Sequence, residues 1–165
     1  NALVSDVLAL YASEPHDSVA RATVVAELDP ACPLILGDEQ QLRQVIHNLL
    51  QNAQDACEVR GQGLANARVQ VRTEWRAQRQ RVRLTVTDTG PGFAPHILQR
   101  AFEPYVTTKA KGTGLGLAVV KKIADEHGAR IDMANVQEGD NIQGAQVSLS
   151  FAVAQTAQGL EQPPS

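Results

Sequence analysis

Apolar residues recur along the chain with two different periods, which predict helices and strands. Apolar positions spaced by three and four residues, together with the turn residues between them, predict helices over 3–11, 38–60, 95–101 and 115–126. Apolar runs and apolar–polar alternation predict strands over 19–28, 34–36, 67–75, 81–88, 129–135 and 145–153. Because strands follow strands rather than alternating regularly with helices, the pattern favours an α+β fold. We expect a two-layer sandwich, with helices on one face of a mixed, largely antiparallel sheet.

The predicted helices are bounded by residues that commonly begin and end helices. Asp38 is suited to cap the start of the second helix, with Gln41 three residues further on. Gly128 is suited to end the helix over 115–126, and His127 to close the same helix end. The last residues are polar and include two prolines. We therefore expect one domain over 1–154 and a disordered tail over 155–165.

Composition and charge narrow the classes of function. The chain has 165 residues, a formal net charge of −3 and only 4% aromatic residues, so we expect no nucleic-acid partner. No apolar run is long enough to cross a membrane, and we expect no membrane contact. Cys32 and Cys57 lack metal-site spacing and are interpreted as reduced thiols of a cytoplasmic domain. The missing initiator methionine indicates a piece of a longer protein, whose parent could be anchored in the inner membrane.

The second predicted helix carries an unusual polar stripe beside its apolar face. Asn48, Asn52 and Asp55 lie together at the edge of that face. Solvated helix faces usually carry Lys, Glu and Arg, whereas asparagine is a mediocre helix former. Two interpretations remain open. The stripe is either an ordinary solvated face or a polar site whose oxygens ligate a hard cation such as Mg²⁺.

Asp88 raises a similar question at the end of a predicted strand. It continues the apolar face formed by Val82, Leu84 and Val86, where an unpaired carboxylate costs several kcal/mol. Asp88 either caps the following "TGPG" turn or acts as a buried acceptor for an N–H group of a ligand. In the second case, the glycines of that turn let a flat group approach the backbone.

A third stretch, "TTKAKGTGLGL", places hydroxyl and ammonium groups before three glycines. Backbone N–H groups at the start of the next helix, with lysines nearby, form a suitable phosphate site. The alternative is a flexible connector. Two familiar phosphate motifs do not fit, since Leu117 replaces the last glycine of G-x-G-x-x-G and the P-loop pattern is absent.

Taken together and in this order, the stretches resemble the ATP-binding catalytic domain of sensor histidine kinases, within the gyrase, Hsp90, histidine kinase and MutL superfamily. "HNLLQNAQDA" resembles the N box, "DTGPGF" the G1 box, "FEPYVTTK" the F box and "GTGLGLAVV" the G2 box. The resemblance covers about residues 1–154 and is most similar to the nitrogen-regulation class. It implies the Bergerat ATP-binding fold, ATP and Mg²⁺ as cofactors, and protein-histidine kinase activity in a two-component system.

The resemblance also implies a role for each motif residue. Asn52 is expected to ligate Mg²⁺, with Asn48 and Asp55 near the phosphates and the water shell of the metal. Asp88 is expected to accept the adenine amino group, and residues 93–111 to form a lid over ATP. The other expected ATP contacts, in the base pocket and around the phosphates, are Gly90, Gly92, Thr108, Lys109, Lys111, Gly112, Thr113, Gly114, Leu115 and Gly116. Asn48, Asn52 and Lys109 are the residues expected to act in catalysis.

The residue at position 48 indicates whether the domain hydrolyses ATP or transfers its phosphoryl group. ATP-hydrolysing relatives of the gyrase type carry a glutamate base where this sequence has Asn48, and an amide does not accept the proton of water. The resemblance therefore implies slow hydrolysis and transfer of the γ-phosphoryl group to a positioned side chain. In sensor kinases this acceptor is a histidine followed by an acidic residue, on a separate helical-hairpin domain. Among the four histidines here, only His16 is followed by an acidic residue, Asp17, and it does not lie on a predicted helical hairpin.

The expected partners are ATP, the histidine-bearing hairpin domain of the parent kinase and, indirectly, a response regulator. Since that hairpin usually supplies dimerisation, the isolated chain is expected to be a monomer that does not autophosphorylate. Two other functions remain open, namely a slow ATPase of the same superfamily and a nucleotide-binding regulatory or interaction module. A serine-directed kinase would share the fold and differ only in its acceptor.

Overall fold

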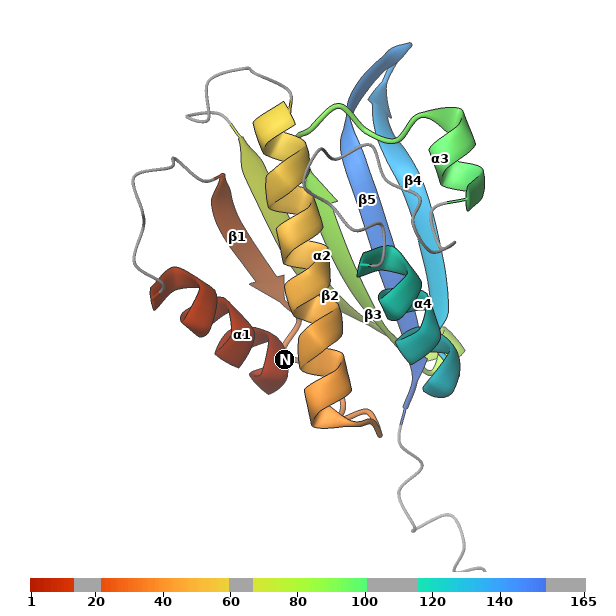
Figure 1. Ribbon diagram of the computed structural model, residues 1–165. Coiled ribbons are helices and arrows are strands. Elements are labelled where there is room, and N and C mark those ends of the chain that lie inside the picture. Colours follow the sequence, from red (N-terminus) through yellow and green to blue (C-terminus); the bar gives the residue numbers. More distant parts are fainter. Residues whose placement is uncertain (14–21, 60–66, 101–115, 154–165) are drawn as a thin grey trace, which may run out of the picture.

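The computed structural model describes residues 1–13, 22–59, 67–100 and 116–153 (Figure 1). The helices are α1 (Ala2–Ser13), α2 (Glu39–Val59), α3 (Pro95–Arg100) and α4 (Gly116–Glu126). The strands are β1 (Thr23–Leu28), β2 (Arg68–Arg76), β3 (Arg81–Asp88), β4 (Arg130–Glu138) and β5 (Asn141–Ala152). A short 3₁₀ helix, η2 (Ala77–Arg79), joins β2 to β3. The expected tail over 155–165 lies outside the described residues. Both this tail and the single domain over 1–154 stay predictions.

The strands form one sheet in the order β1-β2-β3-β5-β4. Only the β1–β2 pair is parallel, and the other three neighbouring pairs are antiparallel. Helices α1, α2 and α4 lie across the same face of the sheet, with α2 between the other two (Figure 1). The predicted α+β sandwich, with helices on one face of a mixed, largely antiparallel sheet, is therefore confirmed.

The apolar stripe of α2 forms the centre of the core between the two layers. Its buried members are Leu42, Val45, Ile46, Leu49, Leu50, Ala53 and Cys57. They share one cluster with strand side chains such as Val69, Val71 and Leu149, which are completely buried. Burial of a large apolar side chain contributes roughly 1.5–3 kcal/mol, so a rotation of α2 about its axis would be costly. The apolar stripe therefore fixes where the polar residues of α2 lie.

Hydrogen bonds join the start of α2 to the end of α4. Asp38 caps α2 as predicted, because its Oδ1 accepts the backbone N–H of Gln41 at 3.0 Å. The side chain of Gln41 donates to Glu126 of α4 at 3.2 Å. The N–H of Asp38 donates to Nε2 of His127 at 3.0 Å, and Nδ1 of that ring lies 2.7 Å from the carbonyl oxygen of Ile123. His127 thus closes α4 and also holds it against α2.

The predicted strand over 34–36 is wrong. Leu34 and Leu36 are 87% and 84% exposed, and this segment pairs with none of the strands in the described sheet. Only Ile35 between them packs against the core. An apolar run becomes a strand only where a neighbouring backbone is available for pairing, and here it serves as a connector with one anchored side chain.

The starts of two other strands differ from the prediction by four residues each. β1 begins at Thr23, because the backbone of the preceding residue, Ala22, bonds to the side chain of Gln54 instead of to a strand. Residues 19–21 lie outside the described residues. β5 begins at Asn141, since its pairing with β4 continues into the tight turn at Gly139, whose φ is +60°. Gly128, with a φ of +62°, follows α4 as predicted.

The close approach of β5 to the end of β3 gives a first prediction, on stability. A Cβ atom at Gly144 would overlap the carbonyl oxygen of Asp88, and backbone atoms have little freedom to move aside. Gly144→Ala is expected to lower the free energy of unfolding by about 3 kcal/mol, measured by urea denaturation. Gly139→Ala is the control, because nothing lies within 4 Å of its Cβ position. Its positive φ should cost only about 1 kcal/mol, and equal losses in both variants would contradict the prediction.

Candidate functional site

Asp88 ends β3 on the side of the sheet that faces the helices, and it is only 8% exposed. Its Oδ1 accepts the backbone N–H of Gly90 at 2.8 Å and that of Ala145 at 3.3 Å. The carboxylate therefore caps the turn and also continues the buried face of the strand. The two N–H donors offset part of the cost of burying a carboxylate.

The loop that follows Asp88 contains two glycines with separate structural reasons. A Cβ atom at Gly90 would lie 2.7 Å from the carbonyl oxygen of Ala56, so this glycine lies against the backbone of α2. Gly92 has a φ of +78°, in the left-handed region that favours glycine. Both glycines are therefore required by the path of the loop, which brings bare backbone close to α2.

On α2, the three polar residues predicted from their spacing are half-buried at the edge of the core. They are Asn48, Asn52 and Asp55, and Asp55 accepts a hydrogen bond from the side chain of Gln51 at 3.0 Å. The start of α4 contacts the middle of this stripe, because a Cβ atom at Gly116 would lie 3.6 Å from Nδ2 and 3.7 Å from Oδ1 of Asn52. The loop after β3 meets α2 one turn further on, about 6 Å along the helix axis. Three segments that are distant in sequence thus meet along α2 and define the candidate site.

The remaining predicted ATP contacts fall outside the described residues. They are Thr108, Lys109, Lys111, Gly112, Thr113, Gly114 and Leu115. The expected lid over 93–111 is described only as far as residue 100. Of Gly112, Gly114 and Gly116, only Gly116 is described. It is the first residue of α4 and lies beside Asn52.

The possible metal ligands at this site can be compared with those that the predicted Mg²⁺ requires. Among the described residues, no group of three or more His, Cys, Asp or Glu side chains is placed to hold a metal ion. Asn52 offers an amide oxygen, a hard neutral ligand that suits Mg²⁺ when phosphate oxygens and water complete its coordination. The residues present therefore fit a Mg²⁺ ion shared with a phosphate ligand better than one enclosed by protein carboxylates.

Two side-chain amides that the sequence analysis missed hold backbone segments in place. Asn135 of β4 accepts the N–H of Phe93 at 2.7 Å and donates to the carbonyl oxygen of Phe93 at 2.8 Å. Gln54 of α2 makes the same pair of bonds with Ala22, at 2.9 Å and 3.0 Å. Asparagine is depleted in strands, and glutamine is seldom as buried as Gln54, which is 2% exposed. An asparagine in a strand and a glutamine near an apolar helix face were the signals in the sequence. The sequence alone does not identify the backbone groups to which they bond.

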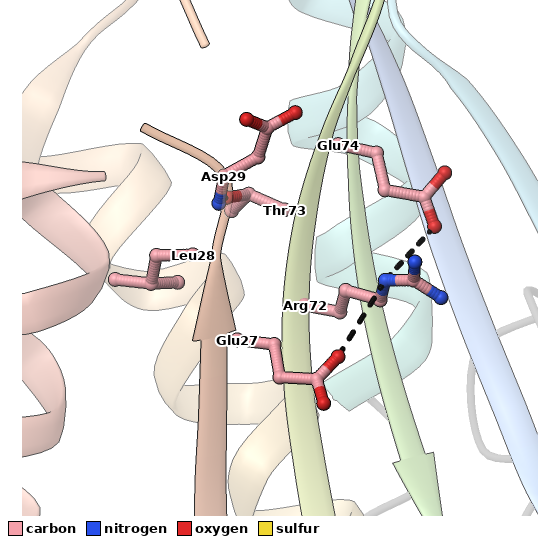
Figure 2. Close-up of a pocket in the computed structure, with 6 residues that line it drawn as sticks. All are labelled: Glu27, Leu28, Asp29, Arg72, Thr73 and Glu74. Atoms are coloured by element: carbon pink, nitrogen blue, oxygen red, sulfur yellow. Dashed lines mark hydrogen bonds and ion pairs between the residues drawn. The ribbon is translucent and has the colours of Figure 1, made fainter. Parts of the chain in front are cut away.

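A hollow of about 250 Å³ lies elsewhere, beside the end of β1 (Figure 2). Its lining residues are Glu27, Leu28, Asp29, Arg72, Thr73 and Glu74. The guanidinium of Arg72 lies between two carboxylates, 3.8 Å from Glu27 and 3.1 Å from Glu74 (Figure 2). None of the predicted site residues lines this hollow. We therefore assign it to the edge of the sheet and not to the site.

Asp29 in this hollow has a structural role. Its carboxylate accepts the backbone N–H of Trp75 and that of Ala31, both at 2.9 Å. The hydrogen bond from Trp75, followed by the one from Ala31, holds the pKa of the Asp29 carboxyl below its usual value. The carboxylate continues the pairing of β2 beyond the end of β1 and fixes the turn after β1.

Comparison with known families identifies the class of protein that this fold and site define. The family described as histidine kinase-, DNA gyrase B- and HSP90-like ATPase matches residues 37–155. The match includes α2, the loop after β3, α4 and four of the five strands. The chain therefore belongs to this ATPase family, and the resemblance predicted from four motifs is confirmed.

Curated relatives narrow the similarity to sensor histidine kinases of the NtrY and NtrB types. The putative sensor histidine kinase NtrY-like of Rickettsia bellii is 40% identical over 114 residues, covering 69% of this chain and 17% of that protein. The sensory histidine kinase/phosphatase NtrB of Rhodobacter capsulatus is 40% identical over 121 residues, covering 69% of this chain and 34% of that protein. The matched part of the chain thus spans only 17% of the first relative and 34% of the second.

Solved structures share the fold over nearly the whole chain. The catalytic domain of the histidine kinase ThkA has a TM-score of 0.74 and 28% identity, covering 92% of this chain and 91% of that one. Full-length ShkA, solved in complex with AMPPNP, has a TM-score of 0.72 and 30% identity, covering 94% of this chain and 30% of that one. The described helices and sheet therefore match those of histidine kinase catalytic domains.

The lowered pKa of Asp29 predicts how stability depends on pH. Because the folded-state pKa is below the usual value of 3.8, the ionised carboxylate stabilises the native state above that pH. This stabilisation is lost as the pH falls through the folded-state pKa. The wild type should therefore lose more stability than Asp29→Asn between about pH 5 and pH 2, as measured by urea midpoints. Asp140→Asn, in the turn between β4 and β5, is the control, and equal acid dependence in wild type and Asp29→Asn would contradict the assignment.

Proposed function

We propose that this chain binds Mg-ATP and donates the γ-phosphoryl group to a histidine on a separate hairpin domain of its parent sensor kinase. The observation that carries the proposal is the meeting of Asn52, Gly116 and the loop after Asp88 in one site, in a chain of the histidine kinase-like ATPase family. The relatives named above are sensor histidine kinases, and ShkA was solved with an ATP analogue. ATP binding is the part of this function that the family membership supports directly.

The proposal assigns adenine recognition to Asp88 and its loop. A buried carboxylate held by two backbone N–H groups is a fixed acceptor, and the exocyclic amino group of adenine is a donor of suitable size. Gly90 and Gly92 leave the loop without side chains that would obstruct a flat base. This arrangement favours adenine over guanine, which presents a carbonyl oxygen where adenine carries its amino group.

Phosphate binding is assigned to the α2 stripe and the segment before α4. Asn52 would hold Mg²⁺, which when bound neutralises phosphate charge. Asn48 and Asp55 are assigned to the surroundings of the phosphates and the metal's water shell. The proposed phosphate contacts further along are Thr108, Lys109, Lys111, Gly112, Thr113, Gly114, Leu115 and Gly116. Because Asn48 offers no base, the site favours positioned transfer over activation of water.

The proposed partners follow from the reaction. The acceptor histidine would lie on the parent's hairpin domain, and the phosphoryl group would then pass to a response regulator. ThkA, 25% identical with a TM-score of 0.66, was solved in complex with the response regulator TrrA. We propose that the isolated chain is a monomer that acts in the cytoplasm. Within the described residues, no helix combines the length and the apolar character needed to cross a membrane.

Two other functions are distinguished by simple outcomes. Steady turnover of ATP by the isolated chain would favour a hydrolytic ATPase. The presence of Asn48, in place of a glutamate base, argues against this function. Binding of nucleotide without phosphorylation of a supplied histidine-hairpin domain would favour a regulatory or interaction module. A serine-directed kinase would phosphorylate a serine of its partner instead of a histidine.

The adenine assignment predicts a selective loss of binding in Asp88→Asn. The asparagine keeps one oxygen for the N–H groups of Gly90 and Ala145, so the fold should survive, but its amide nitrogen repels the amino group of adenine. Mg-ADP at about 100 times its dissociation constant should raise the Tm of the wild type by about 5–11 °C. Asp88→Asn should show little or no shift. A full shift in this variant would contradict the assignment.

The metal assignment predicts that Asn52→Ala separates nucleotide binding from its dependence on Mg²⁺. In the wild type, the Tm shift caused by ADP should increase when Mg²⁺ is added, because the metal is shared between Asn52 and the phosphates. In Asn52→Ala, the shift should be small and the same with Mg²⁺ or EDTA. His47→Ala, an exposed residue on the same helix, is the control and should respond to Mg²⁺ as the wild type does. A normal Mg²⁺ response in Asn52→Ala would place the metal elsewhere.

A further inference from the structure

Hydrogen bonds hold the loop between Asp88 and Phe93 at both of its ends. At its start, Asp88 accepts the N–H of Gly90 at 2.8 Å, and the hydroxyl of Thr89 accepts the N–H of Arg68 of β2 at 3.0 Å. At its end, the side chain of Asn135 makes two hydrogen bonds with the backbone of Phe93, at 2.7 Å and 2.8 Å. The amide of Asn135 thus pairs with Phe93 much as a neighbouring strand would.

The register of the sheet places this second fastening close to the first. Asn135 of β4 lies directly opposite Ala145 of β5, and the N–H of Ala145 donates to the carboxylate of Asp88 at 3.3 Å. The loop therefore leaves β3, crosses the start of β5 and reaches β4 on the helix-facing side of the sheet. It also lies close to Asn135 along the way, since a Cβ atom at Gly92 would come within 2.9 Å of the Oδ1 atom of Asn135.

We propose that Asn135 is a positioning residue for nucleotide binding, which acts by fixing the end of the loop that begins at Asp88. This inference rests on the proposed function, because it concerns the same site. The loop contains two glycines, so it has more conformational freedom to lose than an ordinary segment of its length. A loop already held at both ends loses less entropy when a ligand orders it, and binding is correspondingly tighter. Asn135 itself does not need to touch the nucleotide.

Gln54 provides a matched comparison within the same protein. Its amide makes the same pair of bonds with the backbone of Ala22, but these bonds hold the start of β1 and not the loop after β3. Loss of either amide removes two hydrogen bonds from the folded state. Only the loss of Asn135 should also release a segment of the nucleotide site.

The test compares nucleotide affinity and local protection in Asn135→Ala, Asn135→Asp and Gln54→Ala. Calorimetric titration of each folded variant with Mg-ADP should give a Kd about tenfold weaker than the wild type in both Asn135 variants. Asp has the size of Asn and can still accept the N–H of Phe93, but it presents oxygen to the carbonyl of Phe93. It therefore separates loss of the donated hydrogen bond from loss of packing. Gln54→Ala should have a lower Tm and an unchanged Kd.

Amide hydrogen exchange of the nucleotide-free protein gives the direct readout. In Asn135→Ala the amide of Phe93 should exchange faster, because it loses its acceptor, while the amide of Gly90 stays protected by Asp88. An unchanged Kd in Asn135→Ala, measured beside an Asp88→Asn variant that does not bind, would overturn this inference and leave the proposed function intact. A wild type that does not bind Mg-ADP would overturn both. An equal loss of affinity in Gln54→Ala would show a general effect of stability and would also overturn the inference.

Discussion

The structure depends on a close approach of backbone to backbone at the end of β3. There the carbonyl group of Asp88 lies against Gly144 of β5, and Gly90 lies against the carbonyl of Ala56 in α2. A side chain at either glycine would separate the loop from the sheet or from the helix. Because both contacts are between main-chain segments, neither can be relieved by a change of rotamer. The buried carboxylate of Asp88, which accepts N–H groups from the loop and from β5, completes the junction.

The core holds the other half of the site in place. The apolar stripe of α2 is buried against the sheet, and this fixes the rotation of the helix about its axis. This orientation holds three polar residues at the edge of the core, where they are half-buried. They are Asn48, Asn52 and Asp55. The hydrophobic effect is non-directional. Burial of a single apolar stripe nevertheless fixes the rotation of a helix, and this determines where its polar residues lie.

Other stabilising contacts lie away from the site. His127 joins the end of α4 to the start of α2, and Asp29 fixes the turn after β1. The bonds of His127 lie at the opposite end of α4 from Gly116. The bond between Asp29 and Trp75 lies at the opposite end of β2 from Arg68, whose N–H donates to Thr89 in the loop after β3. The division is physically reasonable, because a site that must admit a ligand benefits from a rigid frame that does not itself require the ligand.

The sequence by itself determined the elements with strong local signals and the family. The period of α2, the alternation in β2 and β3, the cap at Asp38 and the glycine after α4 are local features, and four motifs in series were enough to indicate the ATPase family. Only the tertiary structure decided which backbones are neighbours. It left residues 34–36 without a strand partner, placed Gly144 against Asp88, and paired Asn135 with Phe93 and Gln54 with Ala22. Each of these depends on contacts between residues far apart in the chain, and spacing along a sequence carries no information about which distant segment will provide the partner.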